Sequence, residues 1–253
     1  VFARHQPTAV MHLAAESHVD RSIDRPADFI QSNLVGTYQV LDCSLRYLAT
    51  LNAPQAARFR ILHVSTDEVY GSLSLDAPAF REGDAYQPNS PYSASKAGAD
   101  HLAMAWAHTF GLPVLITNCT NNYGPYQFPE KLIPVVIMKA LAGQPIPIYG
   151  RGDNVRDWLH VDDHVRALTL ILERGRLAQR YNIGGECEVS NLQLVKQICA
   201  LLDDLEPSAS GTSYAQLIQF VEDRPGHDLR YAIDISKVRT EFAWQPRHTL
   251  ANG

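Results

Sequence analysis

Short apolar runs alternate with longer helical stretches in the first half of the chain, and this alternation constrains the fold more than any other feature. The runs Ala9–Leu13, Ile61–Ser65 and Val114–Thr117 have the length and composition of buried parallel strands. Between them we expect helices from about Pro26 to Ala49 and from Pro91 to His108, the second opened by a proline, a favourable first-turn residue. This repeated strand–helix pattern predicts an α/β fold with a Rossmann-like, doubly wound parallel sheet.

The pattern becomes less regular after about Gly124, which predicts a second, smaller part. The expected elements are helices at Leu132–Ala142, Asp162–Glu173 and Leu192–Leu205, strands at Pro147–Tyr149 and Tyr181–Ile183, and a polar stretch around Ser208–Ser213. We therefore expect residues 1–124 to form the Rossmann-like domain. Residues 125–253 should form mainly a smaller α/β cap, with some strands and helices returning to the first domain.

The beginning of the chain indicates that part of the first domain is missing. The opening Val1-Phe2-Ala3-Arg4-His5 looks like the middle of a helix and leads directly into a strand. No GxxGxxG turn, the usual cradle for a cofactor pyrophosphate, occurs in the 253 residues. We therefore expect a fragment whose sheet lacks its first βαβ unit and which does not bind a dinucleotide tightly.

Charge and cysteine usage narrow the possible partners. A formal net charge of −5 and a pI near 6.0 provide no basic field for nucleic acid or anionic lipid. No segment reaches the roughly 18 apolar residues of a membrane helix, and no signal-peptide pattern opens the chain. The four cysteines are far apart and lack metal-ligand spacing, so we expect no metal site, reduced thiols and a cytoplasmic location.

Tyr92 and Lys96 form the first candidate catalytic pair, at the start of the predicted helix from Pro91. Residues four apart share one helix face, so the Lys96 ammonium is expected to lower the phenol pKa of Tyr92 from about 10. Such a phenol can take the proton of an alcohol while hydride leaves the carbon. The spacing alone does not distinguish this pair from an ordinary helix face, because it occurs by chance in many helices.

Asp67 and Glu68 form the second candidate pair, directly after the strand Ile61–Ser65. Open α/β sheets place ligands at the carboxyl ends of their parallel strands. Two neighbouring carboxyl groups there can serve as an acid and a base, because like charges at close range separate their pKa values. As an isolated pair, the two residues could equally cap a helix or face solvent.

Further motifs extend over nearly the whole chain. Those of the first half are the segment from His12 to Ser22 (His-Leu-Ala-Ala-Glu-Ser-His-Val-Asp-Arg-Ser), Asn33-Leu34-Val35-Gly36-Thr37, Thr66-Asp67-Glu68 and Ser90-Pro91-Tyr92-Ser93-Ala94-Ser95-Lys96. Those of the second half are Asn121-Asn122-Tyr123-Gly124-Pro125, Phe128-Pro129-Glu130-Lys131-Leu132, Arg156-Asp157-Trp158, Tyr181-Asn182-Ile183-Gly184-Gly185 and Asp223-Arg224-Pro225-Gly226-His227-Asp228. Together they resemble the extended short-chain dehydrogenase/reductase superfamily, and more closely its dTDP-glucose 4,6-dehydratases.

The resemblance implies an NAD-dependent, redox-neutral lyase that converts dTDP-glucose to dTDP-4-keto-6-deoxyglucose and water, for deoxysugar precursors of the rhamnose or surface-polysaccharide type. Tyr92, helped by Lys96 and Thr66, would remove the C4 hydroxyl proton while hydride passes to NAD⁺. Glu68 would take the C5 proton, Asp67 would protonate the departing C6 hydroxyl, and the hydride would return to C6. A homodimer through a four-helix bundle, built from the two long helices of the first domain, is also implied.

The same resemblance implies two sets of binding residues. The cofactor set is Leu13, Ala14, Ala15, Glu16, Ser17, Ser32, Tyr92, Lys96 and Asn122. The substrate set is Ser17, Thr66, Asn121, Lys131, Leu132, Pro147, Ile148, Tyr149, Arg156, Asn191, Asp223, Arg224, Pro225, Gly226 and His227. Lys131, Arg156 and Arg224 would supply three cations for a diphosphate on an otherwise acidic chain.

Two alternatives stay open. One is a nucleotide-sugar epimerase or decarboxylase of the same fold. Similar epimerases usually have small or hydroxyl residues at the positions of Asp67 and Glu68, and GDP-mannose dehydratases keep only the glutamate, so the intact pair argues against this alternative. The other is a non-catalytic remnant that binds nucleotide or only dimerises, which the four candidate catalytic side chains argue against.

Overall fold

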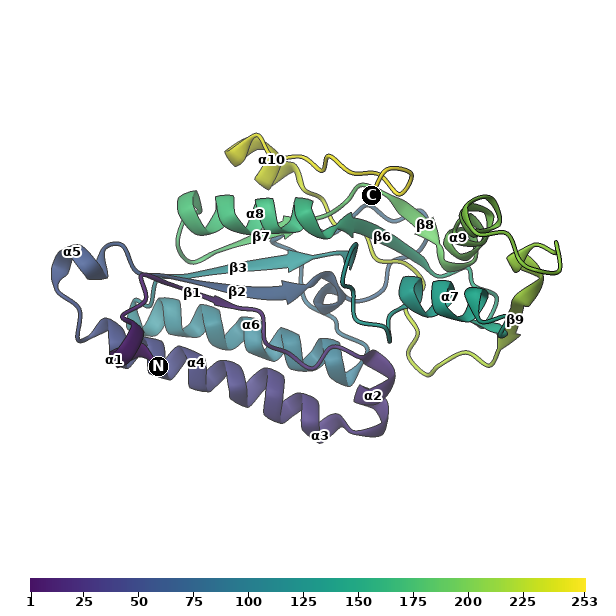
Figure 1. The fold of residues 1–253 in the computed structure, drawn as a ribbon. Coiled ribbons are helices and arrows are strands. Elements are labelled where there is room, and N and C mark those ends of the chain that lie inside the picture. The colour runs from purple at the N-terminus through teal and green to yellow at the C-terminus, as the bar shows by residue number, and fades with distance from the viewer.

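A four-stranded parallel sheet forms the centre of the structure (Figure 1). The computed structural model describes all residues 1–253. The sheet order is β1 (Ala9–His12), β2 (Arg60–Thr66), β3 (Val114–Cys119) and β7 (Gln179–Ile183). The α/β class and the three strands predicted for the first half are confirmed. The fourth strand comes from beyond residue 125 and pairs with β3.

Helices cover both faces of this sheet, as Figure 1 shows. On one face lie α4 (Gly36–Leu48) and α6 (Pro91–Phe110), and on the other lies α8 (Val161–Arg174). The helix predicted from Pro26 is observed as α3 (Pro26–Phe29), a π-helical turn and α4 in direct succession. The α6 helix begins with a capping box between Ser90 and Ser93, which fixes Tyr92 in its first turn.

The second half of the chain adds two small sheets and two long helices. One sheet has the order β4 (Asn121–Tyr123), β6 (Val155–His160) and β8 (Glu188–Ser190), and the other pairs β5 (Ile146–Tyr149) with β9 (Ile218–Val221). The helices α7 (Leu132–Leu141) and α9 (Asn191–Leu205) pack with them around a shared apolar core. The shorter elements are α1 (Phe2–His5), α2 (Val19–Asp24), α5 (Ala53–Ala56), α10 (Ser236–Phe242) and single 3-10 turns at Asp67–Tyr70 and Tyr214–Leu217. No helix in the structure has the length and apolar character needed to cross a membrane.

Strand β6 is the main element that the sequence did not predict. It reads Val-Arg-Asp-Trp-Leu-His, yet Arg156 and Asp157 are both buried. Buried charges require partners, and Asp157 accepts hydrogen bonds from the backbone amides of Gly185 (2.8 Å) and Cys187 (2.6 Å). Arg156 donates to the Asp228 carbonyl at 2.9 Å. Contacts with distant residues therefore determine this strand, and local apolar alternation does not reveal it.

Candidate active site

A cavity of about 330 Å³ opens where the central sheet meets the second half of the chain. It brings together most of the predicted substrate residues, from segments far apart in the sequence. Those lining it are Ser17, Asn121, Lys131, Leu132, Pro147, Ile148, Tyr149, Arg156, Asn191, Arg224 and His227. Glu68 also lines the cavity, so a candidate catalytic carboxylate faces the same space as the three predicted cations.

Four predicted substrate residues do not line this cavity. Thr66 is buried next to it at the end of β2. Asp223, Pro225 and Gly226 belong to the loop that carries Arg224, and the Asp223 carboxylate lies 2.6 Å from Nδ1 of His227. Gly226 has a φ of +65°, a left-handed conformation that glycine adopts without strain. These loop residues shape the position of Arg224 and His227.

The cavity also contains residues that the sequence did not single out as site residues: His18, Val19, Asp20, Glu130, Val135, Trp158 and Tyr231. Asp20 on α2 accepts a hydrogen bond from Arg224 at 2.9 Å and another from the Tyr149 hydroxyl at 3.1 Å. The position of Asp20 within the motif from His12 to Ser22 is the sequence signal that could have identified it as a site residue. Tyr231 lies in no motif, and only the fold brings its ring to 4.3 Å from the Arg156 guanidinium.

Asp67 is buried in the 3-10 turn after β2, with 3% of its surface exposed. Its Oδ1 accepts a hydrogen bond from the Thr66 hydroxyl at 3.2 Å, and its Oδ2 has no hydrogen-bond partner. Burial raises the pKa of Asp67 well above its usual value, and the negative charges of Glu68 and Asp157 add to this effect. These influences favour the protonated carboxylic acid, which is the form that can donate a proton.

Glu68 has a different electrostatic environment, although it is the next residue. Burial raises its pKa overall, and the charges of Arg156 and Arg224 oppose this rise. Its backbone amide donates to the Thr66 hydroxyl oxygen at 3.3 Å, and the Tyr231 hydroxyl lies 3.5 Å from its Oε2. Thus one carboxyl group is enclosed without a cation in contact, and its neighbour faces a cavity that contains several cations.

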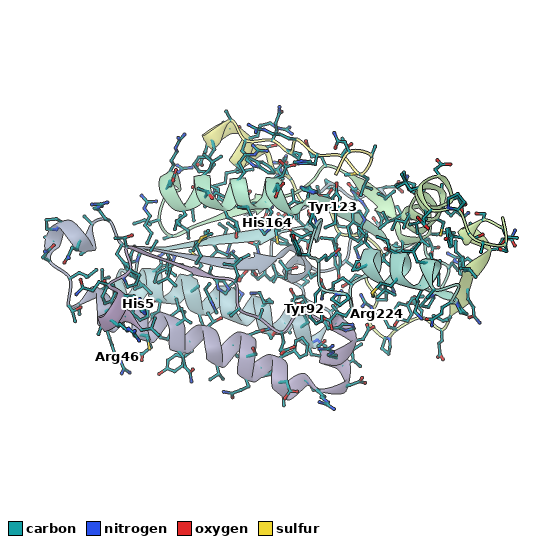
Figure 2. All side chains as sticks on the ribbon, viewed as in Figure 1. His5, Arg46, Tyr92, Tyr123, His164 and Arg224 are labelled. Atoms are coloured by element: carbon teal, nitrogen blue, oxygen red, sulfur yellow. The ribbon has the colours of Figure 1, made fainter.

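Tyr92 and Lys96 share the inner face of α6, as predicted, but their expected pKa relationship is wrong for this structure. Figure 2 shows Tyr92 at the end of α6 that lies nearest α2. Burial raises the pKa of Tyr92 well above its ordinary value, the Glu68 charge adds to this, and the Thr66 hydroxyl opposes it. The Lys96 ammonium donates to the Val64 carbonyl at 2.8 Å. Sequence spacing located the pair but could not show how deeply the phenol is buried.

The predicted cofactor residues lie at the carboxyl end of β1 and on neighbouring elements. Leu13 follows β1 and is 56% exposed. The loop after it is fixed by Asn33 of the π-helical turn, whose side chain bonds the Glu16 amide (2.8 Å) and carbonyl (3.0 Å). Asn122 on β4 is partly buried and its Oδ1 has no partner. An exposed apolar side chain and an unpaired buried acceptor beside a sheet edge fit the nicotinamide half of a dinucleotide.

The remaining predicted cofactor residues surround this same edge. Ala14, Ala15 and Ser17 belong to the loop that follows β1. Ser32 is exposed in the π-helical turn, a feature often found at functional sites.

One cluster of possible metal ligands lies outside the cavity. His160, Asp162 and His248 place one ligand atom each within 4.8 Å of the others. The two imidazole rings are stacked at 4.1 Å, and Nδ1 of His248 lies 3.0 Å from an Asp163 oxygen. A metal binds in the plane of an imidazole ring, so two stacked rings are poorly oriented to share one ion.

The sheet, the Tyr92–Lys96 pair and the cation-lined cavity at the carboxyl ends of the strands together define a protein of the extended short-chain dehydrogenase/reductase class. The chain belongs, more narrowly, to the nucleotide-sugar 4,6-dehydratases. Its residues 1–253 match the model of the family described as GDP-mannose 4,6 dehydratase. The resemblance seen in the sequence is thereby confirmed.

The relatives at high identity carry a more specific name. A dTDP-glucose 4,6-dehydratase of Haemophilus influenzae is 56% identical over 100% of this chain and 75% of its own length. One of Escherichia coli strain K12 is 53% identical over 100% of this chain and 72% of its own length. The chain therefore spans about three quarters of the length of these relatives.

Solved structures give the same result. A dTDP-glucose 4,6-dehydratase of Streptomyces venezuelae, with NAD and TYD bound, has a TM-score of 0.85 and 45% identity over 97% of this chain and 70% of its own. One of Bacillus anthracis in complex with NAD has a TM-score of 0.83 and 41% identity over 100% of this chain and 71% of its own. A UDP-glucose 4-epimerase of Thermotoga maritima reaches a TM-score of 0.84 at 27% identity, so the fold is shared with epimerases.

Proposed function

We propose that this chain carries the catalytic site of an NAD-dependent dTDP-glucose 4,6-dehydratase, a hydro-lyase that forms dTDP-4-keto-6-deoxyglucose and water. The main supporting observation is the pair Asp67 and Glu68, of which Asp67 is enclosed with a raised pKa and Glu68 faces the cavity among cations. Relatives at 52–56% identity with this name support the choice. A pure epimerase has no elimination step and therefore does not need two carboxyl groups in opposite protonation states.

Each candidate catalytic residue has a step that its environment suits. Tyr92, as a phenolate stabilised by the Thr66 hydroxyl beside it, takes the C4 hydroxyl proton and becomes a phenol. Glu68 faces the cavity, takes the C5 proton and gives a proton back to C5 when hydride returns to C6. Asp67 gives its proton to the departing C6 hydroxyl, which leaves as water. NAD, when bound, stores the hydride from C4 and returns it to C6.

Binding of the nucleotide sugar is assigned to the other lining residues. Lys131, Arg156 and Arg224 face the diphosphate, where charge-assisted bonds are strongest. Pro147, Ile148 and Tyr149 of β5 lie along the base, and Asn121, Asn191 and His227 complete the cavity. The cofactor residues named above, with Tyr92 and Lys96, hold the nicotinamide and its ribose. In this proposal residues 1–124 form the cofactor domain and residues 125–253 mainly the substrate cap.

We also infer a homodimer through α4 and α6. Both helices cover the same face of the sheet (Figure 1). Their side chains include three aromatic residues in mutual contact. Tyr38 is 43% exposed and packs edge-on against Trp106 at 5.9 Å, which in turn packs against the 50% exposed Phe110 at 5.4 Å. Exposed aromatics on paired helices favour a bundle with a second copy. A cytoplasmic location and a role in deoxysugar or surface-polysaccharide precursor synthesis complete the proposal.

The test is a single-turnover reaction of the full-length protein with dTDP-glucose in deuterated water, followed by nicotinamide absorbance and mass spectrometry of the sugar. In Glu68→Gln, reduced nicotinamide should form while C5 exchange and elimination fall by about 10²–10⁴. Asp67→Asn should keep C4 oxidation and slow water loss, because an amide cannot supply the proton. In Tyr92→Phe no reduced nicotinamide should form.

Glu173→Gln, an exposed position at the end of α8, is the matched control and should behave as wild type. The assignment is wrong if the Glu68 variant still makes the 4-keto-6-deoxy sugar at a near-normal rate with deuterium at C5.

A further inference from the structure

A buried polar network lies behind Tyr92 and Lys96, and the steps proposed above do not use it. Helix α6 places Tyr92, Lys96 and Asp100 at successive intervals of four residues, so their side chains share one face. Lys96 is 3% exposed and Asp100 is completely buried. Lysine and aspartate are almost never buried this deeply unless they are paired.

Both side chains are held in place by the sheet. The Lys96 ammonium donates to the Val64 carbonyl on β2 at 2.8 Å. Asp100 Oδ1 lies 3.1 Å from Nε2 of His63, also on β2. Its Oδ2 accepts hydrogen bonds from the Tyr86 hydroxyl (2.8 Å) and from Nδ2 of Asn118 on β3 (3.1 Å). These four contacts hold the Lys96 ammonium and the Asp100 carboxylate in fixed positions one helical turn apart.

A buried ammonium needs a nearby negative charge, and three acidic groups act on or near Lys96. Burial raises the pKa of the Cys119 thiol to about 12, so Cys119 is uncharged at neutral pH. Burial also raises the pKa of Asp67 well above its usual value, which favours its uncharged form. For Asp100, burial would raise the pKa, but the bond from His63 and the charge of Lys96 outweigh it and lower the pKa overall. Asp100 is the anion among the three.

The other titratable groups of this region add no negative charge. Burial lowers the pKa of His12 on β1 to about 4 and lowers that of His63 on β2. Burial raises the phenol pKa of Tyr86 and Tyr92. Burial lowers the pKa of Lys96 too, and among the nearby charges Asp100 opposes this most strongly. Lys96 and Asp100 therefore carry opposite charges on one helix face, one turn apart, without a direct salt bridge between them. Two other charges border the network, because Glu68 acts on Tyr92 and Arg180 lies 4.7 Å from the centre of the Tyr86 ring.

We propose that Asp100 is a positioning residue of this site: its buried carboxylate, one helical turn from Lys96, keeps the Lys96 amine charged on the helix face shared with Tyr92. Asp100 acts through Lys96, since Asp100 itself lines no cavity and touches no substrate. The catalytic consequence rests on the proposed function, whereas the influence of Asp100 on the Lys96 charge is a property of the folded chain. The two are tested separately.

The influence of Asp100 on the Lys96 charge is tested by NMR titration of the full-length protein labelled with ¹³C at lysine Cε, whose shift reports ionisation of the amine. The Lys96 signal is identified by its loss in Lys96→Met. Asp100→Asn should lower the Lys96 midpoint by about one pH unit or more. Asp100→Glu keeps the charge and should keep the midpoint. Asp163→Asn, an equally buried carboxylate on α8, should leave it unchanged.

An unchanged Lys96 midpoint in Asp100→Asn would overturn the influence of Asp100 on the Lys96 charge. If that variant folds poorly, the double variant Lys96→Met/Asp100→Asn decides the question. Removing both charges should restore part of the lost melting temperature, because the uncompensated buried charge is gone. If the double variant instead loses the sum of the two single-variant decreases in melting temperature, Asp100 acts only through its hydrogen bonds with Tyr86 and Asn118.

The positioning role has its own readout in the single-turnover reduction of the nicotinamide by dTDP-glucose. Asp100→Asn should lower this rate about tenfold or more near neutral pH, corresponding to one pH unit in an ionisation midpoint, with the KM for the sugar unchanged. Asp100→Glu should recover much of it. A normal rate in Asp100→Asn would refute the role. If wild type does not oxidise dTDP-glucose, the proposed function fails while the NMR result still stands.

Discussion

Replacement of Asp67 by asparagine should change how the stability of the protein depends on pH. The native pKa of Asp67 is raised well above the unfolded value of about 3.9, chiefly by burial. The native state therefore retains a proton that the unfolded chain releases between these two values. Stability is greatest below the unfolded pKa and falls as pH rises toward the native pKa. Asparagine has no such proton, so the variant lacks this loss.

The size of this pH dependence of the unfolding free energy follows from the single proton that Asp67 binds on folding. Linkage gives a change of about 1.36 kcal/mol per pH unit for each proton taken up on folding. Within the interval between the unfolded and the native pKa, the unfolding free energy of wild type should therefore fall relative to Asp67→Asn by about 2.7 kcal/mol for every two pH units. The absolute difference at one pH also contains the change in hydrogen bonding at the unpaired Oδ2, so the slope is the informative quantity.

The measurement is denaturant unfolding of the full-length protein at pH 5, 6, 7 and 8, followed by tryptophan fluorescence. Asp163→Asn is the matched control, because Asp163 is equally buried. Burial would raise its pKa, but hydrogen bonds from the His248 amide and from Arg166 outweigh this and lower it to about 2. That group is ionised in both states over the whole range, so the control difference should stay constant. A constant difference for Asp67→Asn as well would refute the claim that Asp67 is protonated.

Three further outcomes are expected for the full-length protein. Arg156→Ala or Arg224→Ala should weaken dTDP binding by about 1.5–3 kcal/mol, and unchanged affinity by calorimetry would place these arginines outside the site. Light scattering at micromolar concentration should give the mass of a dimer, and a monomer would contradict the α4–α6 interface. Gly185→Ala should destabilise the fold by more than about 3 kcal/mol, since its Cβ would lie 1.9 Å from the Trp158 carbonyl oxygen. Gly83→Ala, with nothing within 4 Å, is its control, and similar melting temperatures would show that the backbone at residue 185 adjusts.

The sequence predicted the first half of the fold well because its elements have local signals. The strand around Ile61 is a continuous apolar run, and the helix from Pro91 has its capping box at Ser90. Strand β6 has no comparable signal, because its buried charges are satisfied by residues some thirty or seventy positions away. The same reason explains why Tyr231 was missed. The predicted direction of the Tyr92 pKa shift was wrong, because residue spacing identifies neighbours along a helix but does not show how deeply a side chain is buried.

Strand β6 also explains why two adjacent carboxyl groups experience different charges. Successive side chains of a strand point to opposite faces, so Arg156 lines the cavity while Asp157 turns toward the Gly185 and Cys187 amides. Burial raises the pKa of both Asp67 and Glu68. At Glu68 the Arg156 charge is the strongest influence opposing this rise, whereas at Asp67 the charges of Glu68 and Asp157 each add more to it than Arg156 removes. The division of acid and base that we propose between Asp67 and Glu68 therefore depends in part on the pleat of a strand that reads, in the sequence, as a polar loop.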